Sequence, residues 1–223
     1  AEHLKPGATL SDVGSVKHAA AQAMIGHAPE NVFVVPAHPV AGTEHSGPDA
    51  GFADLFRNRW TLITPREDRK DDAAYQAAVQ TLVAFWQALG ANVELMEERH
   101  HDLVLAVTSH LPHLIAYTIV GSANDLENVT ESEVMKFSAG GFRDFTRIAA
   151  SDPTMWRDVF LTNKDAVLEM LGRFTEDLQT LQRAIRWGEG DKLHEHFTRT
   201  RALRRGLIEL GQESAEPNFG RKN

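Results

Sequence analysis

The chain has 223 residues, of which 42% are hydrophobic and 24% are charged, enough for one large domain or two modest ones with a packed core. Its net charge of -8 argues against a nucleic-acid-binding protein, although a local cluster of arginines could still hold a small anionic substrate. It has no cysteine, which excludes disulfides, zinc–thiolate sites and cysteine nucleophiles.

Hydropathy and the first residues favour a soluble cytoplasmic protein with no membrane partner. No apolar run approaches the ~18 residues of a membrane span, and the first ten residues lack the apolar core of a signal peptide. The chain does not begin with Met, and "KPGATLSD" is typical of a loop that enters a strand inside a domain. We therefore expect that an N-terminal piece precedes Ala1.

Strands and helices alternate over the first 96 residues. The strands are expected where β-branched and aromatic residues gather, and the second helix where apolar residues recur on one face before Gly90. The predicted strands lie at 8–12, 31–37, 59–65 and 91–96, and the predicted helices lie at 14–25 and 71–89. This alternation indicates an α/β sheet with crossover helices.

After residue 96 the strand pattern disappears. Residues 97–123 predict one long helix, kinked at Pro112 because proline lacks the amide N–H that the helix needs. Residues 138–156 are expected to be irregular and to end at a helix start, and 164–186 carry a heptad-like apolar seam. We therefore expect a domain boundary near 96, with an α/β part before it and an all-helical part after it.

The polar stretch "HPVAGTEHSG" begins where the predicted strand 31–37 ends. In open α/β sheets, ligands bind beyond the carboxyl ends of the strands, so His38 is a candidate general base. Ser15 follows the first strand and would lie at the same edge if the two strands are parallel neighbours. Capping of the following helix explains Ser15 equally well.

The stretch "SHLPH" brings Ser109, His110 and His113 together, with the two histidines on one helix face. A substrate site at a helix opened by Pro112 is favoured. A metal pair ranks second, because candidate third ligands such as His101 lie about three turns away. A histidine satisfied inside a helix interface remains an alternative for His110.

The stretch "GGFRDFTR" is the strongest candidate for an anion site. Gly140 and Gly141 let the backbone approach a ligand, and Arg147 could hold a carboxylate through two parallel hydrogen bonds. Asp144 could hold Arg147 or a histidine in place. A surface salt bridge would explain the charges, but it would not explain the glycines or the neighbouring phenylalanines.

Four stretches in this order, "SDVGSVK", "HPVAGTEHSG", "SHLPH" and "GFRDFTRIAASDPTMWRD", resemble the prephenate/arogenate dehydrogenase family of tyrosine biosynthesis. The resemblance implies the C-terminal part of a Rossmann-like dinucleotide-binding domain at 1–96. It implies an all-α substrate-binding and dimerisation domain at 97–223. The expected reaction oxidises prephenate or arogenate with NAD or NADP and releases carbon dioxide, in a homodimer without a metal.

The resemblance also assigns roles to individual residues. His38 would accept the proton of the substrate hydroxyl, Ser15 would lie near that hydroxyl and the nicotinamide, and Trp156 would reach in from the partner subunit. The residues implied in substrate binding are Ser109, His113, Arg147, Thr43, Glu44, Asp144 and Trp156. The residues expected at the cofactor are Asp12, Gly14 and Ser15.

One departure from the family is large. The glycine-rich phosphate loop G-x-G-x-x-G and the acidic residue that follows it are absent, so these 223 residues alone are expected to bind a dinucleotide poorly. A non-catalytic dimerisation or ligand-sensing module is the alternative. The residues do not separate prephenate from arogenate or NAD from NADP.

Overall fold

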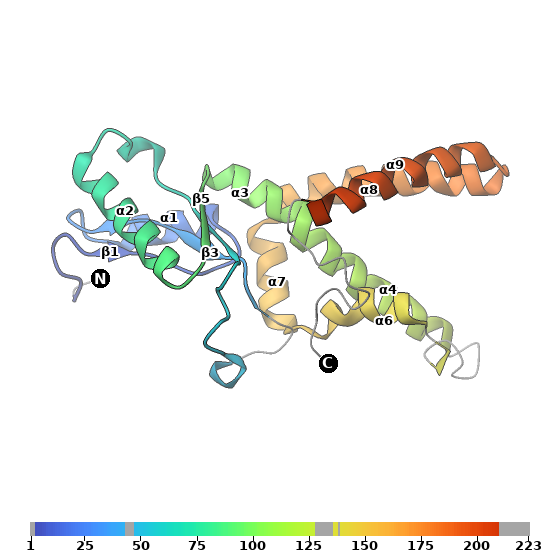
Figure 1. Ribbon diagram of the computed structural model, residues 1–223, viewed down its shortest axis with the longest axis horizontal. Coiled ribbons are helices and arrows are strands. Elements are labelled where there is room, and N and C mark those ends of the chain that lie inside the picture. Colours follow the sequence, from blue (N-terminus) through green and yellow to red (C-terminus); the bar gives the residue numbers. More distant parts are fainter. Residues whose placement is uncertain (1–2, 43–46, 128–135, 138, 210–223) are drawn as a thin grey trace. The chain divides into compact units, whose positions relative to one another are not determined.

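The computed structural model describes residues 3–42, 47–127, 136–137 and 139–209 (Figure 1). The chain forms two compact units, residues 1–170 and 171–223. The first unit holds every strand of the described chain and the helices up to α7, together with the first turns of α8. It therefore contains all the candidate site residues.

Two small sheets form the α/β part, which confirms the predicted alternation. Strand β1 (Thr9–Leu10) pairs in parallel with β2 (Phe33–Val34), and α1 (His18–His27) connects them. In the second sheet β4 (Trp60–Ile63) pairs in parallel with β5 (Asn92–Leu95), after the crossover helix α2 (Ala73–Ala88). Short 3₁₀ turns lie at Pro48–Ala50 and Glu67–Arg69.

The predicted strand 31–37 is in fact two short strands. The amide of Val35 still bonds to Leu10 of β1, whereas β3 (Ala37–Pro39) pairs antiparallel with β4. Pro36 lies between them and has no amide N–H to donate, so the chain changes from one sheet to the other there. His38 consequently lies opposite Leu62 on the second sheet.

The core of this part packs α2 against the sheets. Tyr75, at the start of the helix, is fully buried, and its hydroxyl donates to the carbonyl of Val34 at 3.0 Å. Asp72 caps the same helix by accepting from the amides of Ala74 and Tyr75. The buried cluster consists of Val35, Ala37, Ile63, Tyr75, Val79, Trp86 and Ala91.

Helix α1 begins four residues later than predicted, and Ser15 does not cap it. The amides of Lys17 and His18 instead donate to the carboxylate of Asp102, at 2.7 and 3.0 Å. Because a carboxylate satisfies these donors and favours the positive end of the helix, a residue 85 positions away replaces the local cap. The alternative role predicted for Ser15, at a ligand, stays open.

The long helical segment is continuous but changes its hydrogen-bond spacing. It comprises α3 (Glu98–Leu105), a π-helical turn η3 (Ala106–His110) and α4 (Leu111–Glu127). The amide of Leu111 donates to the carbonyl of Ala106, five residues earlier. The wide turn directly precedes Pro112, whose ring would crowd the carbonyl four residues earlier in a regular α-helix.

The expectation that no stretch approaches a membrane span is wrong by length and composition. The helical stretch Glu98–Asp125 is long and apolar enough to cross a membrane. This is weak evidence of a span, because a core helix of a soluble protein passes the same test. Here the stretch carries buried polar groups, namely His101, Asp102 and His110, which a lipid-facing helix would have to satisfy in hydrocarbon.

Residues 138–156 are more regular than predicted. They contain α6 (Gly140–Thr146) and a 3₁₀ turn η4 (Arg147–Ala150), and Asp152 then caps α7 (Pro153–Thr162) as expected. The two glycines begin α6 with exposed backbone and do not form an open loop.

The last two helices are α8 (Lys164–Arg186) and α9 (Gly190–Glu209), joined by a turn at Gly188, which has a φ of 68°. Glycine suits this turn because the left-handed conformation costs it little. Of the predicted apolar seam, Leu178 and Ile185 are exposed in this single chain. Other large apolar residues exposed in the second unit are Trp187, Phe197 and Leu203.

Candidate active site

A cavity of about 360 Å³ in the first unit brings together six of the residues predicted from the sequence. They come from five separate segments: the loop before α1, strand β3, the π-helical turn with the start of α4, the turn η4, and α7. The predicted residues that line it are Ser15, His38, Ser109, His113, Arg147 and Trp156.

The strand end that carries His38 is held by a partly buried ion pair. Lys17 is fully buried, forms an ion pair with Asp12, and donates from Nζ to the carbonyl of Ala37 at 2.7 Å. Asp12 also accepts from the amide of Ala37 at 3.2 Å. Both polar groups of the residue before His38 are therefore fixed, which orients the imidazole at the cavity wall.

His38 continues into a chain of buried polar groups. Its Nδ1 lies 2.9 Å from Nε2 of His101, whose Nδ1 lies 2.9 Å from the Asp102 carboxylate. His101 and Asp102 are 0% and 5% exposed. Sequence reasoning missed this pair, having weighed His101 only as a distant metal ligand. The adjacent His-Asp dipeptide at a helix start was a weak signal.

The surroundings of His38 keep its imidazole neutral. Burial lowers the pKa of His38 to about 3, and electrostatic interactions with His101, Lys17 and His110 act in the same direction. A neutral imidazole can accept a proton at neutral pH, as the base role requires.

Ser15 and its neighbours suit the nicotinamide end of a cofactor. Ser15 lines the same cavity as His38. Gly14 is exposed, and its amide donates to Asp12 at 2.9 Å, so an added Cβ would lie only 3.0 Å from that carboxylate. Asp12 has both oxygens engaged within the protein, which suits shaping the loop better than contacting a ligand.

An aromatic surface and a fixed histidine form another wall. His113 donates from Nδ1 to the carbonyl of Ser109 at 2.9 Å and stacks on Trp156. Trp156 is 6% exposed and packs on Val16. It lines the cavity of its own chain, so the expectation that it enters from a partner subunit is not needed to place it here.

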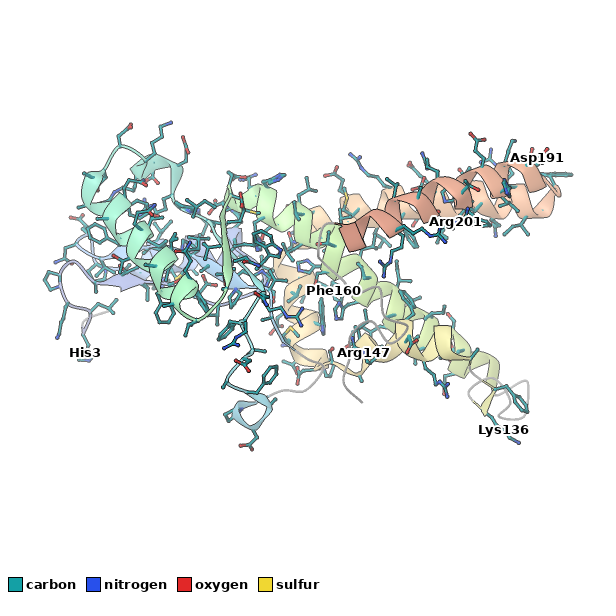
Figure 2. The ribbon with its side chains drawn as sticks, in the orientation of Figure 1. His3, Lys136, Arg147, Phe160, Asp191 and Arg201 are labelled. Atoms are coloured by element: carbon teal, nitrogen blue, oxygen red, sulfur yellow. The ribbon has the colours of Figure 1, made fainter. Side chains whose placement is uncertain are left out.

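Two guanidinium groups line the cavity. Arg147, labelled in Figure 2, comes from the turn between α6 and α7, and its charge helps burial to lower the pKa of His113. Tyr117 secures this region by donating to the carbonyl of Ser151 at 2.7 Å. Arg59, directly before β4, also lines the cavity and was missed, because one arginine before a strand carries no motif.

The remaining predicted residues are placed differently. Asp144 is exposed on α6 and does not line this cavity, so its supporting role stays a prediction. Thr43 and Glu44 lie outside the described residues. His110 is buried away from the cavity lining, with Nδ1 3.1 Å from Nδ2 of Asn163. Its Nε2 is buried and has no hydrogen-bond partner among the described residues, so the alternative of a satisfied histidine in a helix interface is met at one nitrogen only.

Both parts of the chain match models of one protein family. Residues 1–95 match the family model of the prephenate dehydrogenase nucleotide-binding domain, and 97–199 match that of the prephenate dehydrogenase dimerisation domain. A cyclohexadienyl dehydrogenase from Zymomonas mobilis is 41% identical over 92% of this chain and 68% of its own length. A prephenate dehydrogenase from Bacillus subtilis is 34% identical over 94% of this chain and 55% of its own length.

Solved structures give the same result. A prephenate dehydrogenase from Aquifex aeolicus, in complex with hydroxyphenyl propionate and NAD+, has a TM-score of 0.82 and 32% identity over 92% of this chain and 68% of that one. An arogenate dehydrogenase from Synechocystis has a TM-score of 0.75 and 26% identity, and the match covers 92% of this chain and 72% of that one. The chain spans between about half and two thirds of the curated relatives it matches. It belongs to the prephenate dehydrogenase family.

Proposed function

We propose that the protein to which this chain belongs oxidises prephenate or arogenate with NAD or NADP and releases carbon dioxide, in tyrosine biosynthesis. The observation that carries the proposal is the neutral imidazole of His38 in a cavity that also holds Arg147 and Arg59. The cavity thus pairs a base for a hydroxyl with two cations for carboxylates. A module that only senses a ligand has no need of such a base.

In this proposal His38 accepts the proton of the ring hydroxyl at Nε2 while the carbon that carries the hydroxyl gives up a hydride. The bound nicotinamide supplies the hydride acceptor. The bond to the ring carboxyl group then breaks, carbon dioxide leaves, and its electron pair makes the ring aromatic. The phenolate oxygen takes the proton back from His38, so the reaction needs no net proton. Alignment of ring and base is the main contribution of the protein.

The other cavity residues bind and orient the substrate. Arg147 holds a carboxylate, Trp156 and His113 supply an aromatic wall for the ring, and Ser109 fixes His113 through its carbonyl. Ser15 lies between the reacting hydroxyl and the nicotinamide, with Gly14 and Asp12 shaping that loop. Thr43 and Glu44 at the pocket edge and Asp144 beside Arg147 complete the proposed set.

The proposal also includes the domain boundary, the oligomeric state and the location of the protein. We take residues 1–96 and 97–223 as the two functional domains, a division supported by the meeting of the two family models at 95 and 97. A homodimer formed through the helical domain is supported by the dimerisation-domain match and by the exposed apolar residues of α8 and α9. A cytoplasmic location fits such an enzyme.

The decisive experiment replaces His38 with Asn in the full-length protein and assays prephenate and arogenate with both cofactors. Loss of general base catalysis should lower kcat by about 10²–10⁴-fold and leave substrate affinity nearly unchanged. Wild-type protein that turns over neither substrate, or a variant with unchanged kcat, would contradict the proposed function.

A further inference from the structure

A base must present an unprotonated nitrogen to its substrate, and a neutral imidazole has only one. Which nitrogen of His38 is unprotonated depends on what its other nitrogen contacts. That contact is His101, at 2.9 Å from Nδ1. The protonation state of His101 therefore decides whether His38 can act at the cavity.

Asp102 decides the protonation of His101. Although burial opposes its ionisation, hydrogen bonds from His101 and from the amides of Lys17 and His18 lower the pKa of Asp102. An ionised carboxylate only accepts hydrogen bonds, so Nδ1 of His101, 2.9 Å from Oδ1, must carry a proton. A neutral His101 then has an unprotonated Nε2.

The direction of each hydrogen bond from Asp102 through His101 to His38 is then fixed. Because Nε2 of neutral His101 can only accept, the hydrogen bond to His38 requires a proton on Nδ1 of His38. Nε2 of His38 is then the unprotonated nitrogen. Since His38 lines the cavity, this is the tautomer that the proposed base needs.

We propose that His101 and Asp102 are positioning residues for His38: Asp102 orients His101, and His101 holds the Nδ1 proton of His38 so that Nε2 faces the substrate hydroxyl as the base. This inference rests on the proposed function, because it assigns the source of the base form of His38.

The hydrogen-bonded series His38–His101–Asp102 can also accept the substrate proton. When Nε2 of His38 takes the hydroxyl proton, the Nδ1 proton can move to Nε2 of His101 in the same step. The positive charge then lies on His101, beside the Asp102 carboxylate at 2.9 Å. The proton returns by the reverse path when the phenolate is protonated. A buried histidine can thus accept a proton without carrying the charge alone.

Other charged groups around His38 and His101 affect how readily the two histidines take a proton. Lys17, before α1, and His110, in η3, both oppose protonation of His38, and Asp102 favours it. Arg59, His113 and Arg147 enter from the cavity wall. Asp102 is the acidic group among those that affect the pKa of His38 most. Its charge should therefore govern how readily the histidine pair takes a proton.

Three variants of the full-length enzyme separate these effects. His101→Gln keeps an oxygen that can accept from Nδ1 of His38 but cannot take a proton, whereas His101→Phe offers no acceptor. Asp102→Asn removes the charge. His100→Gln is the matched control, because His100 is the neighbouring histidine and is exposed.

We expect kcat to fall by about tenfold in His101→Gln and by about 10²–10³-fold in His101→Phe, with KM within about threefold of wild type. In Asp102→Asn kcat should fall, and the apparent pKa on the acid side of kcat/KM should move to lower pH because the protonated pair loses its counter-charge. Loss of the cap on α1 would lower Tm but would not move that pKa. Kinetics of both His101 variants equal to the control would overturn the proposal.

A measurement without turnover completes the test. Long-range ¹H–¹⁵N spectra of the full-length protein at pH 7 should show His38 protonated at Nδ1 and unprotonated at Nε2. A proton on Nε2 of His38 would overturn the proposal even if His101→Phe failed to fold. Absence of wild-type turnover would instead count against the proposed function, and the spectra would still decide the arrangement of the three residues.

Discussion

The imidazole of His113 stacks on the indole of Trp156, with ring centroids 3.6 Å apart and planes inclined by 23°. The hydrogen bond to the Ser109 carbonyl fixes the same imidazole in its own plane. Because Trp156 also packs on Val16 of the α/β part, the stack joins the two sides of the cavity within the first unit. His113 thus has one position and one nitrogen, Nε2, available for a ligand.

Replacing the indole should therefore weaken substrate binding more than it slows the chemistry. Trp156→Leu removes an aromatic stack worth about 0.5–1.5 kcal/mol and frees the imidazole, so KM should rise by about 3- to 10-fold with kcat less affected. Trp156→Phe keeps a ring and should stay close to wild type. Steady-state kinetics of both variants check this, and an equal loss of kcat in the two would assign the indole to the chemical step.

Substrate binding should take up a proton at His113. Burial lowers the pKa of His113, and Arg147 adds to this effect, so the ring is neutral and its Nε2 can only accept. A carboxylate at that nitrogen requires the charged form. We expect the affinity for hydroxyphenyl propionate to weaken as pH rises above neutrality, and calorimetry in buffers of different ionisation enthalpy to show proton uptake.

His113→Asn is the variant that tests this interpretation. It should bind the same ligand more weakly at pH 6 and should show neither the uptake nor the pH dependence. Uptake that persists in His113→Asn would place the proton elsewhere, and the absence of uptake in the wild type would show that Nε2 accepts from a substrate hydroxyl.

Arg147 should hold a carboxylate remote from the reacting carbon. A charge-assisted hydrogen bond contributes about 1.5–3 kcal/mol, so Arg147→Ala should raise KM by about 10- to 100-fold and lower kcat much less. Arg147→Lys should recover only part of the loss, because an ammonium group lacks the planar pair of donors. Equal losses in kcat and kcat/KM would place Arg147 in the chemical step.

Residues that act through local context could be predicted from the sequence, and those that act through distant contacts could not. His38 follows a β-branched run, and Ser109 and His113 lie around a proline in a helical pattern; both are local signals. His101 and Asp102 matter only because the chain folds them against positions 63 and 85 residues away. The cap predicted at Ser15 failed for the same reason, since propensity favours a local cap and Asp102 supplies a distant one.

The exposed apolar side chains of α8 should hold a second copy of the chain. Leu178 and Ile185 lie seven residues apart in the predicted seam and are 48% and 67% exposed. Burial of such side chains contributes about 1.5–3 kcal/mol each, so replacing both with Glu should convert a dimer to monomers in light scattering. Thr180→Glu is the control, because Thr180 is exposed on the same helix but does not line the groove that Leu178 and Ile185 line. A dimer unaffected by the Leu178/Ile185 pair would place the interface elsewhere.

Acid should destabilise the fold through two buried histidines. Burial lowers the pKa of His38 to about 3 and that of His110 to about 4, whereas both have a pKa near 6.5 when unfolded. Between these values the unfolded chain binds more protons, so the free energy of unfolding should fall as pH drops below 6.5, by about 1.4 kcal/mol per pH unit for each histidine. Urea unfolding from pH 7 to pH 5 measures this slope.

His110→Gln, which can still accept from Asn163, should reduce the pH dependence of the free energy of unfolding by the contribution of one proton. His100→Gln, at an exposed position, should leave it unchanged. An unchanged slope in His110→Gln would mean that the folded protein binds a proton at His110 as readily as the unfolded chain does.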